Sequence, residues 1–249
     1  MAQPWKTIDK KETPDGVLEL RQRGERDFLI LINGRVLMNS SANRSELALG
    51  VLACSAVADR NAPRVLIGGL GMALTLRAAL NALPTSARVV IAELNPAAVD
   101  WCRGPLAQLT DCAVDDPRVS VVLDDVARVI RTAAESVGEK FDAIVIDLYE
   151  GPHAKTDSRN DPFYGSIALR NARNALVPGG VFGVWGEAPD RAFEKRLEAA
   201  GFLFERLRPG RGGLRHVVYL ARKNDGRQPG AAEAKLRRPP GTAQEERIP

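Results

Sequence analysis

A glycine cluster and a downstream glutamate have the types and spacing of a nucleoside-binding site. Gly68, Gly69 and Gly71 directly follow a short apolar run. Glycines let the backbone approach a ligand closely, and a helix beginning after them presents free N–H groups. Glu93 ends the next apolar run, about 20 residues further on, where a carboxylate can accept hydrogen bonds from both ribose hydroxyls. The simpler alternative is a tight turn followed by a solvent-facing acid.

Asp147 is the second candidate, because it ends a continuous apolar run and precedes the polar segment 148–160. Ligands of open parallel sheets bind at the carboxyl ends of the strands, so we expect this segment to cover a substrate. Segment 148–160 contains Tyr149, which would either stack on a substrate or cover the loop. It also contains Glu150, which would be either a second acid of the site or a solvated loop residue. An imidazole can act as a base near neutral pH, so His153 is a further candidate, with a solvated loop residue as the alternative.

The elements that must position these residues alternate between apolar strands and amphipathic helices. We expect strands at 65–67, 88–92, 119–123, 141–146 and 181–185, and helices at 43–59, 72–83, 96–101, 105–109, 126–134, 161–176 and 190–200. An antiparallel pair, 202–207 and 214–221, closes the domain. Asp161 before Pro162, and Asp190, are expected to begin the last two helices. The pattern predicts a doubly wound α/β domain with a mostly parallel sheet.

The chain divides into three predicted parts. Residues 1–42 form a loosely held polar arm (1–16) followed by a small antiparallel meander, for which Asn33-Gly34 is the hairpin signal. Residues 43–222 form the α/β domain. Residues 223–249 are rich in Pro, Gly, Ala and charge, which predicts a disordered basic tail.

Charge and composition limit the classes of partner. The net charge is +4, but residues 222–249 hold seven basic and four acidic residues, so the folded part is nearly neutral and nucleic acid is not an expected partner. There is no apolar run long enough to span a membrane and no apolar signal region, so we expect a cytoplasmic protein. Three cysteines at no metal-ligand spacing indicate buried or incidental thiols and no metal.

Several motifs together resemble the class I S-adenosylmethionine-dependent methyltransferase fold and, more narrowly, the spermidine synthase (polyamine aminopropyltransferase) family. The resemblance implies a seven-stranded sheet with an N-terminal β-hairpin extension, and a homodimer formed through that extension. The matching segments are 65–71, Glu93, 116–119, Asp125, 141–147 and 163–181.

The resemblance implies a role for each motif residue that contacts the nucleoside. The turn containing Leu70 would pass the sulfonium of S-adenosylmethionine or decarboxylated S-adenosylmethionine, and Glu93 would hold the ribose. Asp125 would bind the adenine amino group with Asp124 as its helix cap or neighbour, although either aspartate would also serve simply as a cap.

On the acceptor side, the resemblance implies that Asp147 takes the proton of the attacking amine, with Glu150 as its acidic partner. The family carries an Asp in the glycine turn, where this chain has Leu70, which weakens the preference for a donor with a cationic tail. Of the family's Tyr-His-Glu series, only Glu46 is matched, and Arg44 beside it would repel a diamine.

These features predict a transferase that alkylates a small amine, with a slight preference for methyl transfer from S-adenosylmethionine. An authentic aminopropyltransferase is the close alternative. A nucleic-acid methyltransferase and a non-catalytic nucleoside-binding protein are the other interpretations.

Overall fold

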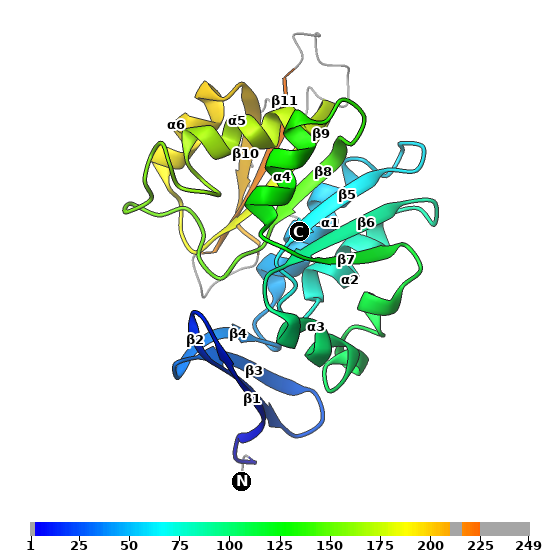
Figure 1. Cartoon of the computed structure of the whole chain (residues 1–249), viewed down its shortest axis with the longest axis vertical. Helices are drawn as coiled ribbons and strands as arrows, with labels where there is room; N and C mark the ends of the chain where they lie inside the picture. The colour runs from blue at the N-terminus through cyan, green and yellow to red at the C-terminus, as the bar shows by residue number, and fades with distance from the viewer. Residues whose placement is uncertain (1–2, 210–215, 225–249) are drawn as a thin grey trace, which may run out of the picture.

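The computed structural model describes residues 3–209 and 216–224 and contains two sheets. The smaller N-terminal sheet lies at one end of the larger one (Figure 1). Nearly all of the expected tail, 225–249, lies outside the described residues. The antiparallel strands of the smaller sheet are β1 (Lys6–Thr13), β2 (Gly16–Arg23), β3 (Asp27–Ile32) and β4 (Arg35–Asn39).

The prediction of a loosely held arm over 1–16 is wrong for residues 6–13. They form β1, which pairs with β2 from Lys6 opposite Gln22 to Thr13 opposite Gly16. Almost every β1 side chain is exposed, so the strand lacks the apolar alternation that would have revealed it. Backbone hydrogen bonds to β2 hold the strand in place. In addition, Asp9 Oδ2 accepts a 2.7 Å hydrogen bond from the indole of Trp101, which belongs to the domain of the larger sheet.

The larger sheet has the strand order β10-β11-β9-β8-β5-β6-β7, and the predicted doubly wound, mostly parallel seven-stranded fold is confirmed. Strands β5 to β9 are parallel, and β11 pairs antiparallel with both β9 and β10. The strands are β5 (Arg64–Gly68), β6 (Arg88–Glu93), β7 (Val119–Leu123), β8 (Phe141–Ile146), β9 (Leu176–Gly186), β10 (Phe202–Leu207) and β11 (Val217–Lys223).

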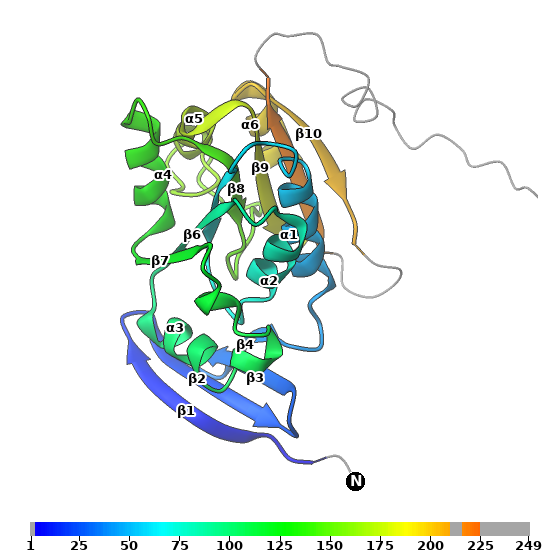
Figure 2. The same ribbon diagram turned by 90° about the vertical axis from the view of Figure 1, so that its right-hand side faces the viewer.

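Helices cover both faces of this sheet, with α1 and α2 on one side and α4 and α5 on the other (Figure 2). The Asn95, Asp125 and Asp190 side chains cap α3, α4 and α6 by accepting backbone N–H groups. The helices are α1 (Arg44–Ser55), α2 (Leu74–Ala82), α3 (Pro96–Arg103), α4 (Val126–Glu135), α5 (Ser166–Ala175) and α6 (Arg191–Ala199).

Two predicted helix starts are wrong, and α1, expected to reach residue 59, ends at Ser55, where turns replace the helix. Asp161 Oδ1 accepts hydrogen bonds from the N–H groups of Phe163 and Tyr164, but this cap closes only a turn, and α5 begins at Ser166. Pro105 does not restart α3, because only a 3₁₀ turn forms over Ala107–Leu109. Both errors arise because a cap and a proline also initiate isolated turns.

The core lies on both faces of the larger sheet, and β8 is buried as predicted for a central strand. Cys54 and Cys102 are buried, and burial raises the pKa of each thiol to about 12, so neither is reactive; Cys112 is exposed. No helix within the described ranges is long and apolar enough to cross a membrane.

Arg118 ties the start of β7 to the end of α2. Its guanidinium forms a two-pronged pair with Asp116 (2.9 and 2.8 Å), and its Nη1 donates to the carbonyl oxygens of Leu80 (2.9 Å) and Leu83 (3.2 Å). The guanidinium lowers the pKa of the Asp116 carboxyl to about 2. One side chain therefore satisfies groups on two elements.

We expect Arg118→Ala to lower the free energy of unfolding by about 2–3 kcal/mol at pH 7, because it leaves a half-buried carboxylate and helix-end carbonyls unpaired. Urea unfolding of wild-type and variant proteins measures the change. The matched control is Arg128→Ala, whose solvent-screened pair with Asp124 should contribute much less to stability. Equal decreases in the free energy of unfolding of the two variants would show that Arg118 contributes no more to stability than an exposed ion pair does.

Candidate functional site

The glycine turn lies directly against the end of β8. Gly68 O accepts the Asp147 N–H at 3.0 Å, and a Cβ at Gly69 would collide with the Asp147 carbonyl oxygen. Gly69 and Gly71 have φ of +88° and +52°, and a Cβ at Gly71 would lie 2.8 Å from Met38 Sδ. Packing within the chain therefore requires glycine here, in addition to the predicted approach of a ligand.

Glu93 organises the same turn from β6. Its Oε2 accepts the Leu70 N–H at 2.8 Å, and its Oε1 accepts the Asn95 N–H at 2.7 Å. Each carboxylate oxygen has a second lone pair, so ribose hydroxyls can still be bound by this half-buried side chain. The ribose role stays a prediction. Leu70 itself is buried in the core, and the segment 68–76 holds no acid.

Asp124 and Asp125 differ from their predicted division of labour. Asp125 is itself the cap of α4, because its Oδ1 accepts the Ala127 N–H at 2.8 Å. Asp124, expected as the cap, instead accepts a 2.6 Å hydrogen bond from Arg128, which lowers the pKa of Asp124. The Asp125 side chain is exposed, so a second oxygen remains for an adenine amino group, which stays a prediction.

Asp147 and Glu46 are the two acids that the fold brings together. Thr75 lies between the Asp147 carboxyl group and the main chain of Glu46: its hydroxyl donates to Asp147 Oδ2 at 2.5 Å and lies 3.3 Å from the backbone carbonyl oxygen of Glu46. The pKa of Asp147 is raised to about 7, chiefly because the carboxyl group is removed from water; the Thr75 hydrogen bond opposes this rise, and the nearby charge of Glu46 adds to it. Asp147 is therefore poised to exchange a proton near neutral pH.

Glu46 lies in the first turn of α1 and is only 8% exposed. Its Oε2 accepts a 2.6 Å hydrogen bond from the Ser45 hydroxyl. No arginine, lysine or histidine of the described residues forms an ion pair with it. A mostly buried carboxylate without a cationic partner is costly, so this position favours binding of a cation from outside the chain.

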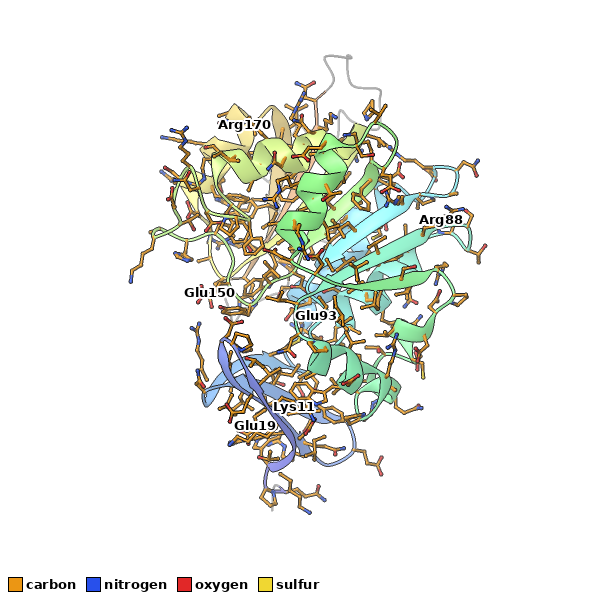
Figure 3. All side chains as sticks on the ribbon, viewed as in Figure 1. Lys11, Glu19, Arg88, Glu93, Glu150 and Arg170 are labelled. Carbon is orange, nitrogen blue, oxygen red and sulfur yellow. The ribbon has the colours of Figure 1, made fainter. Side chains whose placement is uncertain are left out.

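Among the described residues, the other loop candidates form no hydrogen bond or ion pair with these two acids. Glu150 is exposed and pairs with Arg35 of the N-terminal sheet at 3.6 Å, and Figure 3 shows Glu150 and Glu93 on the side of the larger sheet that faces the smaller one. Tyr149 is 57% exposed. His153 is also exposed, and its Nδ1 accepts the Lys155 N–H, which closes a turn. Their substrate roles stay predictions.

No sequence pattern indicated a role in the site for Thr75, His216 or Trp185. Thr75 carries no signal, because a threonine in the first turn of an apolar helix is typical of core packing. His216 and Trp185 reach Ser45 from the other half of the domain, at 3.0 and 3.1 Å. Within residues 3–209 and 216–224, no group of three or more potential ligands is arranged to hold a metal ion.

Comparison with known proteins decides the family. The spermine/spermidine synthase domain model matches residues 49–193, which is more than half of the chain. The chain belongs to this family. The match includes the glycine turn, Glu93 and Asp147, and it ends within α6.

The curated proteins that this chain resembles in sequence are polyamine aminopropyltransferases. One from Mycobacterium tuberculosis is 34% identical over 134 residues, which cover 54% of this chain and 24% of the relative. One from Aeropyrum pernix is 28% identical over 189 residues, covering 72% and 58%. The chain thus spans from about a quarter to less than two thirds of the length of these relatives.

Solved structures support the fold. Spermidine synthase from Thermotoga maritima superposes with a TM-score of 0.67 at 19% identity, covering 88% of this chain and 73% of that one. A spermidine synthase in complex with the transition state analogue AdoDATO gives a TM-score of 0.66 at 18% identity. The methyltransferase-like fold expected from the sequence is therefore confirmed, and so is the resemblance to spermidine synthases.

The raised pKa of Asp147 predicts a pH-dependent difference in stability between wild-type protein and Asp147→Asn. Well below pH 3.8, the ordinary pKa of the group, the carboxyl is protonated in both folded and unfolded states. As the pH rises from there to 7 the unfolded state ionises first, so the wild-type protein loses up to ~4 kcal/mol of stability that the neutral Asn keeps. Urea unfolding at pH 4, 6 and 8 measures this gap. A gap that stays constant would mean that Asp147 titrates at its ordinary value.

Proposed function

We propose that this protein is a polyamine aminopropyltransferase that moves the aminopropyl group of decarboxylated S-adenosylmethionine to a small amine carrying a second positive charge. The observation that carries the proposal is the convergence of Asp147 and Glu46 beside the glycine turn. One carboxyl group suits proton transfer, and the other suits binding of an ammonium group.

The free oxygens of the two acids support this division of labour. Asp147 Oδ2 and Glu46 Oε2 are occupied by Thr75 and Ser45, while neither Oδ1 nor Oε1 has a hydrogen-bond partner in the described chain. Neither oxygen is among the fully buried atoms without a partner, so each keeps some exposed surface. An acceptor amine that binds here would therefore find an unoccupied oxygen on each carboxyl group and would displace no existing hydrogen bond.

The reaction balances with this residue set and needs no metal. The lone pair of the acceptor nitrogen attacks the carbon attached to the sulfonium, the carbon–sulfur bond breaks, and its electron pair neutralises the sulfur. The new ammonium then gives its proton to ionised Asp147. Since the sulfonium is already a good leaving group, holding the amine and accepting its proton are what the chain must supply.

Decarboxylated S-adenosylmethionine is the favoured donor because of the family to which the chain belongs. The comparisons favour aminopropyl transfer over the slight preference for methyl transfer drawn from Leu70. The missing acid in the turn, where this chain has Leu70, remains a departure from the family pattern. A homodimer formed through the N-terminal sheet belongs to the same proposal and is testable by light scattering.

The deciding experiment incubates purified protein with 1,4-diaminobutane and either decarboxylated or intact S-adenosylmethionine. We expect methylthioadenosine and an aminopropylated amine, identified by mass spectrometry, only with the decarboxylated donor. Methylated amine with the intact donor would replace the proposal with methyl transfer. Donor binding by calorimetry without turnover on any amine would favour the non-catalytic interpretation.

Asp147→Asn tests the proton acceptor. We expect kcat to fall at least tenfold with donor affinity unchanged, because Asn cannot take the proton but leaves the nucleoside site intact. Steady-state kinetics and donor titration separate the two effects. The matched control is Asp100→Asn, which changes an exposed acid on α3 and should leave both quantities unchanged. Lost donor affinity in Asp147→Asn would assign this residue to the donor instead.

Thr75→Val tests how the pKa of Asp147 is set. In the wild-type protein, kcat/KM should rise with pH through about 7, as Asp147 ionises. Removing the hydroxyl removes the one hydrogen bond that lowers the pKa of Asp147, so the midpoint should move to higher pH. Thr13→Val, which deletes a hydroxyl bonded to Gly16 O in the N-terminal sheet, is the control. An unmoved midpoint would mean that another group controls the profile.

A further inference from the structure

Ser45 is the meeting point of three elements beside the two acids. Its hydroxyl, on a side chain that is 4% exposed, lies 2.6 Å from Glu46 Oε2, 3.1 Å from Trp185 Nε1 and 3.0 Å from His216 Nδ1. Ser45 and Glu46 belong to α1, Trp185 to β9, and His216 directly precedes β11. Three groups thus compete for one hydroxyl.

Counting protons limits how these groups can bond. A hydroxyl has one proton and two lone pairs, and the Trp185 indole N–H can only donate, so it occupies one lone pair. One proton and one lone pair remain for Glu46 and His216. The 2.6 Å separation from Glu46 Oε2 is the length of a hydroxyl bonded to a carboxylate. The hydroxyl therefore donates to Glu46, and His216 Nδ1 must carry a proton and donate to Ser45.

His216 is held in the orientation that this count requires. Its ring packs edge-on against the Trp185 ring, with centroids 4.9 Å apart and an interplanar angle of 71°. The imidazole is half-buried. Its orientation is fixed by the indole on one side and by the Ser45 hydroxyl at Nδ1. A donor at Nδ1 keeps the Ser45 proton directed at Glu46.

These hydrogen bonds fix the orientation of the Glu46 carboxylate before any ligand binds. Its Oε2 is tied by a charge-assisted hydrogen bond, and its Oε1 stays accessible without a partner in the described chain. A fixed carboxylate loses less conformational freedom on binding a cation than a mobile one does. The chain from His216 through Ser45 to Glu46 therefore prepares a site for an ammonium group.

We propose that His216 is a positioning residue for acceptor specificity: by donating through Nδ1 to Ser45, it holds Glu46 ready for the far ammonium of a diamine. This role rests on the proposed function, because it assigns the second charge of the acceptor to Glu46 and the attacking amine to Asp147. It predicts discrimination between a diamine and a monoamine of the same length.

The test compares 1,4-diaminobutane with n-butylamine in wild-type protein, His216→Leu and His216→Asn. Leucine removes the donor, so we expect KM for the diamine to rise about tenfold, with kcat within threefold and KM for the monoamine unchanged. Asparagine places an amide N–H near the position of Nδ1 and should restore KM for the diamine to within about threefold of wild type.

Ser45→Ala provides the second variant and a double-mutant cycle. If His216 acts through the serine, His216→Leu should add no further loss in the Ser45→Ala background. Ser166→Ala, which deletes a hydroxyl bonded to Ser158 O outside the site, is the matched control and should leave the diamine preference unchanged. Thermal unfolding and donor titration of each variant identify any that fail to fold.

The outcomes separate this role from the proposed function. Unchanged diamine preference in folded His216→Leu and Ser45→Ala, or equal losses for both amines, would overturn the positioning role while leaving aminopropyl transfer standing. If the wild-type protein transfers no aminopropyl group, calorimetric titration with 1,4-diaminobutane still decides the role. Binding that weakens about tenfold in His216→Leu supports it, and equal or absent binding in both proteins overturns it.

Discussion

The close contact between the glycine turn and the end of β8 is the constraint on which the rest of the site depends. The turn after β5 hydrogen bonds to both neighbouring strands, through Gly68 O to the Asp147 N–H and through the Gly69 N–H to Ala92 O. A side chain at Gly69 would separate the turn from β8. This contact places the Asp147 carboxyl against the first turn of α2, where Thr75 meets it.

The same contact gives the two halves of the site different electrostatics. On the β6 side, the carboxylate of Glu93 is stabilised by two backbone N–H groups, which fixes it as an acceptor for hydroxyls. On the β8 side, desolvation dominates at Asp147 and keeps its proton affinity high. One acid is thus suited to binding and the other to proton transfer, although both end parallel strands of one sheet.

The acceptor side of the proposed site is assembled from residues far apart in the chain. Glu46 comes from α1, Thr75 from α2 and His216 from the last part of the domain, and hydrogen bonds through Ser45 and Thr75 link them. In such a network each hydroxyl can serve only a limited number of partners, so the proton positions of neighbouring groups depend on one another. A serine and a threonine thereby control how two carboxyl groups present their charge.

The sequence by itself determined the α/β alternation, the glycine turn, and the strand-end positions of Glu93 and Asp147, because apolar periodicity and glycine placement are local properties. It could not reveal β1, whose exposed polar side chains are ordered by pairing with β2, or the later start of α5. Only the tertiary structure decided that Glu46, rather than Glu150, lies beside Asp147, and that Thr75 and His216 complete the group. Those contacts join distant segments through packing and burial, which no local pattern encodes.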